Sequence, residues 1–271
     1  MTELLRWGVD LLRHLLRTLD WPLLGALLAL MAIGLAVLYS AGGEALGSHL
    51  VLAQGVRFGV GLVAMWALSR VTPVRLRAWT PGVFAVALLP LVLVLFIGTG
   101  KHGAHWIDLK FFYLQPSELL KFALVIYMTN ILGRRQRELT DFKRTFRPAM
   151  LAWLVAAGIA MAQRDLGAAI VLSGIAFTVL YMAGSPVRWI GAAALGAMVG
   201  GLGYVLTSST GISRWTAFLD IEGNREHSAY QVWQSMLSIS NGGITGVGPG
   251  AGTSKWGYVP LAHSDFIFTV I

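Results

Sequence analysis

The residues of this chain best suited to chemistry lie near its end, where a glycine-rich stretch carries Lys255, His263 and Asp265. Asp265 is one of only 13 acidic residues among 271, and an apolar run, 266–268, follows it directly. Apolar surroundings would desolvate the carboxylate and make it a stronger base. We therefore predict that Asp265 accepts a proton in a reaction, with His263 either hydrogen-bonded to it or capping a turn.

The glycines before Asp265 resemble a phosphate-binding loop only superficially. Gly246, Gly248, Gly250 and Gly252 alternate with other residues. No GK[ST] ending follows them and no strand pattern precedes them, as nucleotide-binding loops require. We interpret these glycines as positions where the backbone runs close to lipid or to another helix.

Two further polar groups lie next to apolar runs, where polar residues are costly and therefore candidate site residues. The sequence QPSE at 115–118, followed by Lys121, opens one such run. Glu118 and Lys121 are three residues apart on one helical face, so they form either a structural ion pair or a substrate contact. Asp165, in the sequence QRDLG at 163–167, belongs either to a short polar turn or to a site.

The composition indicates a membrane protein. Of the 271 residues, 56% are hydrophobic and only 13% are charged, whereas a soluble domain carries roughly 25% charged residues. Apolar runs of helix-spanning length repeat along the chain, which predicts an all-α polytopic membrane protein. The absence of cysteine excludes disulfides and cysteine-ligated metal sites. The net charge of +8 fits the cytoplasmic membrane surface better than nucleic acid, because of its placement.

Seven apolar runs have the character of transmembrane helices. They are 21–39, 50–68, 83–98, 116–132, 149–162, 168–183 and 189–206. Basic residues precede the first run and follow the second, fourth and sixth, whereas the loop 40–48 has none. By the positive-inside rule, the N-terminus is cytoplasmic and the segment after the seventh run lies outside. We therefore predict a large extracytoplasmic loop, 207–266, that contains Asp265.

The sequence also makes predictions for the two ends of the chain. In residues 1–20, leucines share one helical face and Arg6, Arg13 and Arg17 the other, which predicts an interfacial amphipathic helix, with a soluble arm as the alternative. The first apolar run exceeds the usual length of a signal-peptide core. No linker or repeat marks a second domain, so we expect one membrane domain over 1–271. A fresh apolar run at the last residues leads us to expect a longer protein.

Four blocks of the sequence resemble one family of membrane proteins. They are LYSAGGE at 38–44, HWIDLKFFYLQPSELLK at 105–121, QRDLG at 163–167, and the block 230–268 that ends in HSDFIF. These blocks are similar to those of the SEDS proteins, namely RodA, FtsW and their sporulation relatives. The resemblance runs from the first span to the last residue. It implies about ten spans in a complete protein, of which this chain would hold about seven.

The resemblance also implies an activity. SEDS proteins are peptidoglycan glycosyltransferases that polymerise lipid II, an undecaprenyl-pyrophosphate-linked disaccharide peptide, at the outer face of the bacterial cytoplasmic membrane. The implied partners are a class B penicillin-binding protein and other elongation or division machinery, with no nucleic acid. The family's essential acid maps onto Asp265, and its QPSE-x-x-K pair onto Glu118 and Lys121. A role in cell elongation and a role in division both stay open.

Inverting transfer to a sugar hydroxyl needs one general base, which we assign to Asp265, and positive charge at the diphosphate leaving group. Lys255 is the main candidate for that charge. Weaker candidates are Arg214, Lys101 and Lys110. A divalent cation, Mg²⁺ or Mn²⁺, is an alternative, although the sequence shows no convincing ligand cluster for a metal.

The chain departs from the family pattern at Arg164, where proline is common, and at Leu261, where glutamate is usual. The second departure leaves Asp265 as the best-supported acid of its loop. Two other functions stay open, a lipid II flippase or transporter and a non-catalytic scaffold for a penicillin-binding protein. The first, third, sixth and seventh runs carry no internal charge, which disfavours a charged translocation path.

Overall fold

The structure is a computed structural model that describes residues 20–97, 106–108, 113–243, 245–248, 252, 259 and 263–270. Internal contacts divide the chain into two compact units, one formed by residues 1–68 with 213–271 and the other by residues 69–212. The predicted amphipathic helix 1–20 lies outside the described residues except for Asp20. The single domain over 1–271 stays a prediction.

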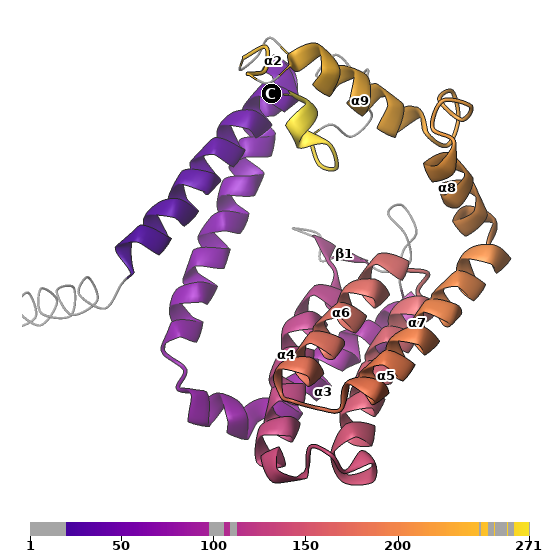
Figure 1. Cartoon of the computed structure of the whole chain (residues 1–271). Coiled ribbons are helices and arrows are strands. Elements are labelled where there is room, and N and C mark those ends of the chain that lie inside the picture. The colour runs from indigo at the N-terminus through magenta and orange to yellow at the C-terminus, as the bar shows by residue number, and fades with distance from the viewer. Residues whose placement is uncertain are drawn as a thin grey trace, which may run out of the picture. The chain divides into compact units, whose positions relative to one another are not determined.

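The unit formed by residues 69–212 is a helical bundle (Figure 1). Its long helices are α3 (Pro73–Ile97), α4 (Pro116–Arg134), α5 (Arg147–Ala162), α6 (Leu166–Met182) and α7 (Val187–Thr207). Between them lie the antiparallel strands β1 (Ile107–Asp108) and β2 (Tyr113–Leu114), the 3₁₀ turn η1 (Gln136–Glu138) and the π-helical turn η2 (Phe142–Phe146). Helix α4 contacts α3, α5 and α6, so α4 is the central helix of this bundle.

Local sequence explains where two of these helices begin. Pro116 follows the extended residue Gln115 and occupies the first turn of α4, where its missing N–H leaves no hydrogen bond unmade. Asp165 caps α6, because its carboxylate accepts a hydrogen bond from the backbone N–H of Ala168 at 2.9 Å. Both helices begin within two residues of the predicted runs at 116 and 168.

The core of this bundle combines large side chains on its central helices with alanines on its neighbours. Leu120, Leu124 and Met128 of α4 are fully buried. Around them pack fully buried alanines of α5 and α6, namely Ala149, Ala156, Ala160 and Ala176. Small residues let helix backbones approach closely, which is how helices associate in membranes.

Among the described residues, five helical segments are long and apolar enough to cross a membrane. They are Trp21–Gly42, Leu46–Ser69, Pro73–Phe96, Phe142–Ala162 and Val187–Thr207. Helix α6 is apolar but has 17 residues, and α4 carries Glu118 and Lys121 in its first two turns. A helix therefore forms at each of the seven predicted runs, and the predicted all-α polytopic membrane fold is confirmed.

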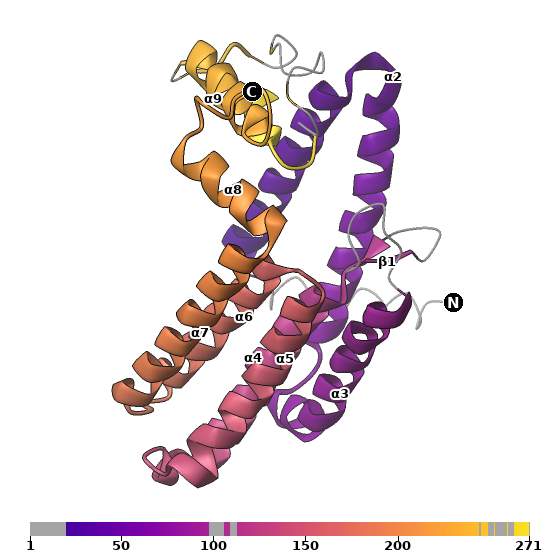
Figure 2. The same ribbon diagram turned by 90° about the vertical axis from the view of Figure 1, so that its right-hand side faces the viewer.

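The first two predicted spans form one continuous helix, α2 (Trp21–Ser69), in place of two helices and a loop at 40–48. The helix bends sharply near its middle, as both views show (Figures 1 and 2). At the bend, a Cβ atom on Gly42 would lie 2.7 Å from the Cα atom of Gly47. Two glycines permit this approach without a break in helical structure, and the predicted loop is wrong for that reason.

The segment predicted as the loop 207–266 holds two helices that the prediction did not include. They are α8 (Ser209–Leu219) and α9 (Tyr230–Gly242), and the 3₁₀ turn η4 (Ile267–Val270) follows them. Helix α8 interleaves Ser and Thr, and α9 interleaves Ser and Gln, with aromatic and apolar residues, so no continuous apolar run signals them. In both views α9 lies beside η4, which it contacts (Figures 1 and 2).

Candidate functional site

Asp265 lies in a turn formed by residues 263–265, directly before η4. Next to it, Phe266 packs with Val259 and Val270 against Val37 and Ala41 of α2. The turn is therefore attached to α2 through apolar contacts, while Asp265 itself is exposed. The prediction that the apolar run desolvates Asp265 is wrong, because Asp265 is exposed, Phe266 packs into the cluster with α2, and Phe268 is itself 69% exposed.

The backbone of η4 is closed by its own hydrogen bonds. The carbonyl oxygen of Phe266 accepts from the backbone N–H of Thr269 at 3.0 Å and from the Thr269 hydroxyl at 2.7 Å. Thr269 and Val270 are buried, so these bonds are shielded from water. No hydrogen bond joins His263 to Asp265, although the structure describes both residues. These contacts give Asp265 a defined position while it stays accessible to a substrate.

The sequence did not predict the cavity that lies next to η4. It has a volume of about 220 Å³ and is lined by Ser238 and Ile239 of α9, the glycines 243 and 246, and residues Phe268 and Thr269. Gly243, Gly246 and Gly248 adopt φ angles of 61°, 73° and 95°, which side chains rarely tolerate. Gly243 and Gly246 therefore form a turn that lines this cavity, a role that the sequence did not indicate.

Gly252 is a second place where only glycine fits. A Cβ atom there would lie 2.6 Å from the carbonyl oxygen of Val270. We expect Gly252→Ala to push η4 out of place and lower the free energy of unfolding by about 1–3 kcal/mol. Unfolding in detergent micelles measures this free energy. The matched control is Gly55→Ala in α2, where nothing lies within 4 Å and alanine favours the helix. Equal stability of the two variants would contradict the close contact.

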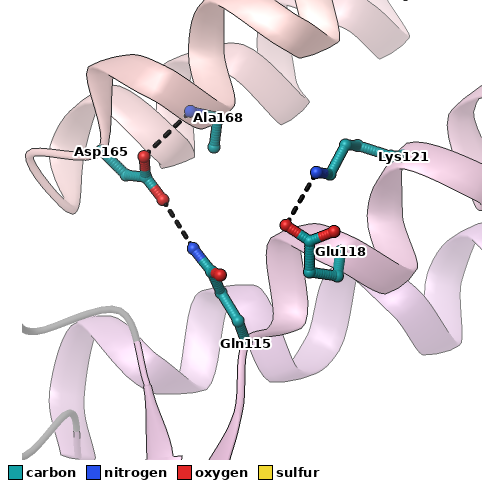
Figure 3. A network of polar contacts seen from close by, with 5 residues as sticks. All are labelled: Gln115, Glu118, Lys121, Asp165 and Ala168. Atoms are coloured by element: carbon teal, nitrogen blue, oxygen red, sulfur yellow. Dashed lines mark hydrogen bonds and ion pairs between the residues drawn. The ribbon is translucent and has the colours of Figure 1, made fainter. Parts of the chain in front are cut away.

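The unit formed by residues 69–212 brings together polar residues that are far apart in sequence. The amide Nε2 of Gln115 donates a hydrogen bond to Oδ2 of Asp165 at 3.0 Å, while Oδ1 of Asp165 caps α6 (Figure 3). Both side chains are half-buried. Asp165 thus connects the start of α4 to the start of α6, a role that the sequence indicated for neither residue.

We expect Asp165→Ala to lower the free energy of unfolding by about 2 kcal/mol, because it removes a helix cap and leaves Gln115 without its partner. Unfolding with SDS in mixed micelles measures the change. Asp165→Asn is the matched control, since asparagine caps helices as well as aspartate does. If the alanine variant is as stable as the asparagine variant, the capping role of Asp165 is wrong.

Glu118 and Lys121 form the ion pair that their spacing predicts. Nζ of Lys121 lies 2.7 Å from Oε1 of Glu118 (Figure 3). The lysine side chain is 23% exposed and the glutamate side chain 56% exposed. An exposed pair of this kind adds little to stability. The pair therefore leaves both groups accessible to a charged ligand.

The segment before α6 contains two features without a specific sequence signal. Nε2 of buried Gln163 donates to the carbonyl oxygen of Leu91 at 2.6 Å, which connects this turn to α3. Arg164 adopts a φ angle of 62°, a conformation closed to proline, whose φ is locked near −65°. Proline could therefore not replace Arg164 in this turn without a change of its backbone.

The other predicted site residues lie only partly within the described residues. Arg214 is exposed on α8, and His263 is half-buried. Lys255, Lys101, Lys110 and Leu261 lie outside the described residues. Within the part of the chain that the structure describes, no group of three or more His, Asp or Glu side chains could hold a metal. Asp265 belongs to one unit, while Glu118, Lys121 and Asp165 belong to the other.

Comparison with known proteins gives a consistent result. The profile of the cell cycle proteins FtsW, RodA and SpoVE matches residues 19–271. The probable peptidoglycan glycosyltransferase FtsW of Geobacter sp. (strain M18) is 36% identical over 216 residues, which are 78% of this chain and 59% of that protein. The protein of the same name from Trichlorobacter lovleyi is 32% identical over 280 residues, covering all of this chain and 72% of the relative.

A solved structure supports the same family. It is described as "Structural coordination of polymerization and crosslinking by a peptidoglycan synthase complex", and one of its chains superposes with a TM-score of 0.72 and 26% identity, over 93% of this chain and 70% of that chain. The aligned part of this chain spans only 59% of the Geobacter relative. The match over residues 19–271, together with these relatives, leads to one conclusion. This chain belongs to the SEDS family of multi-pass membrane proteins, the family of FtsW, RodA and SpoVE.

Proposed function

We propose that this protein is an inverting peptidoglycan glycosyltransferase, which polymerises lipid II into glycan strands at the outer face of the bacterial cytoplasmic membrane. The observation that carries the proposal is the Asp265 carboxylate, exposed on a turn that apolar contacts attach to α2. Two relatives named probable peptidoglycan glycosyltransferase support it. The positive-inside pattern of the spans supports an extracytoplasmic position for the segment after α7.

The reaction joins two lipid-linked sugars. The hydroxyl oxygen of one sugar attacks the anomeric carbon of the other, and Asp265 takes the hydroxyl proton. The bond from the anomeric carbon to the lipid diphosphate breaks, with inversion, and the diphosphate leaves with the bonding electrons. One base suffices because no covalent intermediate forms.

The leaving diphosphate needs positive charge. Lys121, Lys255 and Arg214 are the candidate side chains, because cations placed where negative charge develops stabilise the transition state. Mg²⁺ or Mn²⁺ bound to the diphosphate itself would supply the same charge. If a chelator abolishes the activity and an added divalent cation restores it, the metal and not the side chains supplies this charge.

A class B penicillin-binding protein is the partner that we propose. The similar chain comes from a complex described as coordinating polymerization and crosslinking in a peptidoglycan synthase. A polymerase needs a crosslinking enzyme at the same membrane surface, because uncrosslinked strands do not make a wall. Other elongation or division proteins would recruit the pair.

The experiment is to incubate the purified intact protein, with its penicillin-binding partner, with fluorescent lipid II and separate the products on a gel. We expect a ladder of glycan strands that lysozyme digests. The same protein in sealed vesicles tests the two alternatives. Transfer of lipid II across the bilayer without polymer would indicate a flippase, and neither activity would indicate a scaffold, so either result overturns the proposal.

A further inference from the structure

Ten basic side chains share one end of the unit formed by residues 69–212. They come from residue 70 and the start of α3, the end of α4 and the residue after it, the turns η1 and η2, and the starts of α5 and α7. They are Arg70, Arg75, Arg77, Arg134, Arg135, Arg137, Lys143, Arg144, Arg147 and Arg188, and all are exposed. These segments also contain Glu138 and Asp141. Ten positive against two negative charges leave an excess of eight, which equals the +8 of the whole chain.

Contacts between these segments show that they meet. Nδ2 of Asn130, near the end of α4, donates to the carbonyl oxygen of Arg77 in α3 at 3.5 Å. The ring of Trp189 in α7 lies 5.3 Å from the ring of Phe142 and 5.2 Å from that of Phe146, both in η2. The basic residues therefore form one surface, the basic end, which is the lower end of the bundle in Figure 1.

Both carboxylates of the basic end lie close to the same arginine. Arg144 lies 3.6 Å from Oε1 of Glu138 and 4.0 Å from Oδ2 of Asp141. Among the residues that the structure describes, no carboxylate forms an ion pair with Arg77 or Arg134. The basic end therefore holds arginines whose charge the protein itself does not neutralise.

Asn130 contacts two of these arginines, Arg77 through its backbone and Arg134 through its side chain. Its side chain is buried, its Oδ1 accepts from Nε of Arg134 at 2.9 Å, and its Nδ2 contacts the backbone of Arg77. Nη2 of Arg77 is 3.6 Å from where a Cβ atom of Gly133 would be, so this guanidinium lies against the last turn of α4. Two arginines at one helix junction, one of them positioned by Asn130, suit a phosphate, which arginine binds through paired N–H groups.

Exposed apolar side chains lie on the same segments of the basic end. Val74 and Trp79 of α3 are 79% and 54% exposed, and Val187 at the start of α7 is 65% exposed. The candidate spans Pro73–Phe96, Phe142–Ala162 and Val187–Thr207 all begin at this end. Exposed cations beside exposed apolar and aromatic groups match the boundary between lipid headgroups and acyl chains. An acidic protein or a nucleic acid would not need the apolar groups.

We propose that the basic end binds anionic phospholipid, with Arg77 and Arg134 holding one headgroup phosphodiester and the apolar side chains of α3 and α7 contacting the acyl chains. The positive-inside rule explains only why positive charge lies at this end. It does not predict that two arginines at one junction select a particular headgroup. The proposal is independent of the glycosyltransferase activity.

The test is native mass spectrometry of the delipidated intact protein, titrated in non-ionic detergent with dioleoyl-phosphatidylglycerol or dioleoyl-phosphatidylcholine. We expect tighter binding of the first phosphatidylglycerol. Arg77→Gln with Arg134→Gln should weaken it about fivefold for each charge removed. Arg77→Lys with Arg134→Lys keeps the charge but loses the paired N–H groups, and should give an intermediate value.

The matched control is Arg137→Gln with Lys143→Gln, which removes two exposed charges beside Glu138 and Asp141 and should change binding less than twofold. Equal losses in the two glutamine variants would mean diffuse attraction and overturn the specific site, as would equal binding of the two lipids. Competition by soluble glycerophosphoglycerol at the same concentration would assign the site to free phosphodiesters. Capture of poly-glutamate without lipid preference would indicate a protein-docking surface. Either result overturns the proposal.

Discussion

Replacing Asp265 with asparagine is expected to reduce polymerisation of lipid II at least 100-fold, because a positioned general base contributes about 10²–10⁴-fold. Asparagine keeps the size of the side chain but cannot accept the hydroxyl proton. Asp265 is exposed and makes no hydrogen bond among the described residues, so the change should leave folding intact. Initial rates with fluorescent lipid II, measured with the penicillin-binding partner present, give the comparison.

Two controls make the Asp265 result specific. Asp220→Asn removes an exposed carboxylate of the same unit, whose Oδ1 accepts from the N–H of Gly223 at 2.8 Å, and should keep activity near that of the unchanged protein. Asp265→Glu keeps a carboxylate but extends it by one methylene, and should retain part of the activity. If Asp265→Asn polymerises lipid II at more than half the original rate, Asp265 is not the base.

Lys121→Met is expected to have the second-largest effect, a loss of at least tenfold in polymerisation. Its ammonium group is the one cation of α4's first two turns and is partly exposed beside Glu118, so it can contact an anionic substrate. Removing a positive charge that stabilises a developing diphosphate typically costs more than removing an exposed ion pair. The same polymerisation assay, with the unfolding free energy measured alongside, gives the result.

Glu118→Gln, alone and combined with Lys121→Met in a double variant, distinguishes a role of Lys121 in substrate binding from a role in the fold. If Lys121 acts on the substrate, Glu118→Gln should lose less activity than Lys121→Met, because the cation remains. The double variant should then be as inactive as Lys121→Met. Equal losses in the two single variants, with recovery in the double variant, would show that the ion pair only supports the fold.

Much of the local structure follows from neighbouring residues. Pro116 after extended Gln115 begins α4, and the spacing of Glu118 and Lys121 places them together on one face. Asp165 before an apolar run is an ordinary helix cap. These features depend on interactions within about four residues, so the periodicity and residue types predict them without knowledge of the packing.

Features that depend on distant contacts could not be predicted in this way. The Gln115–Asp165 hydrogen bond joins residues 50 positions apart, and the Asn130–Arg77 contact joins residues 53 positions apart. The continuous helix α2 depends on how closely Gly42 approaches Gly47. A glycine pair is equally typical of a loop, and only the backbone of the folded chain distinguishes these possibilities.

For this protein, the sequence by itself determined the helical membrane fold, the family and the candidate acid Asp265, because apolar periodicity and short motifs are local properties. The exposure of Asp265 depends on the packing, in which Phe266 and Val270 join the cluster with Val37 and Ala41 of α2. Only the tertiary structure decided that basic residues from separate segments form one surface. Which side chains meet is a consequence of helix packing, and helix packing brings together residues that the sequence keeps far apart.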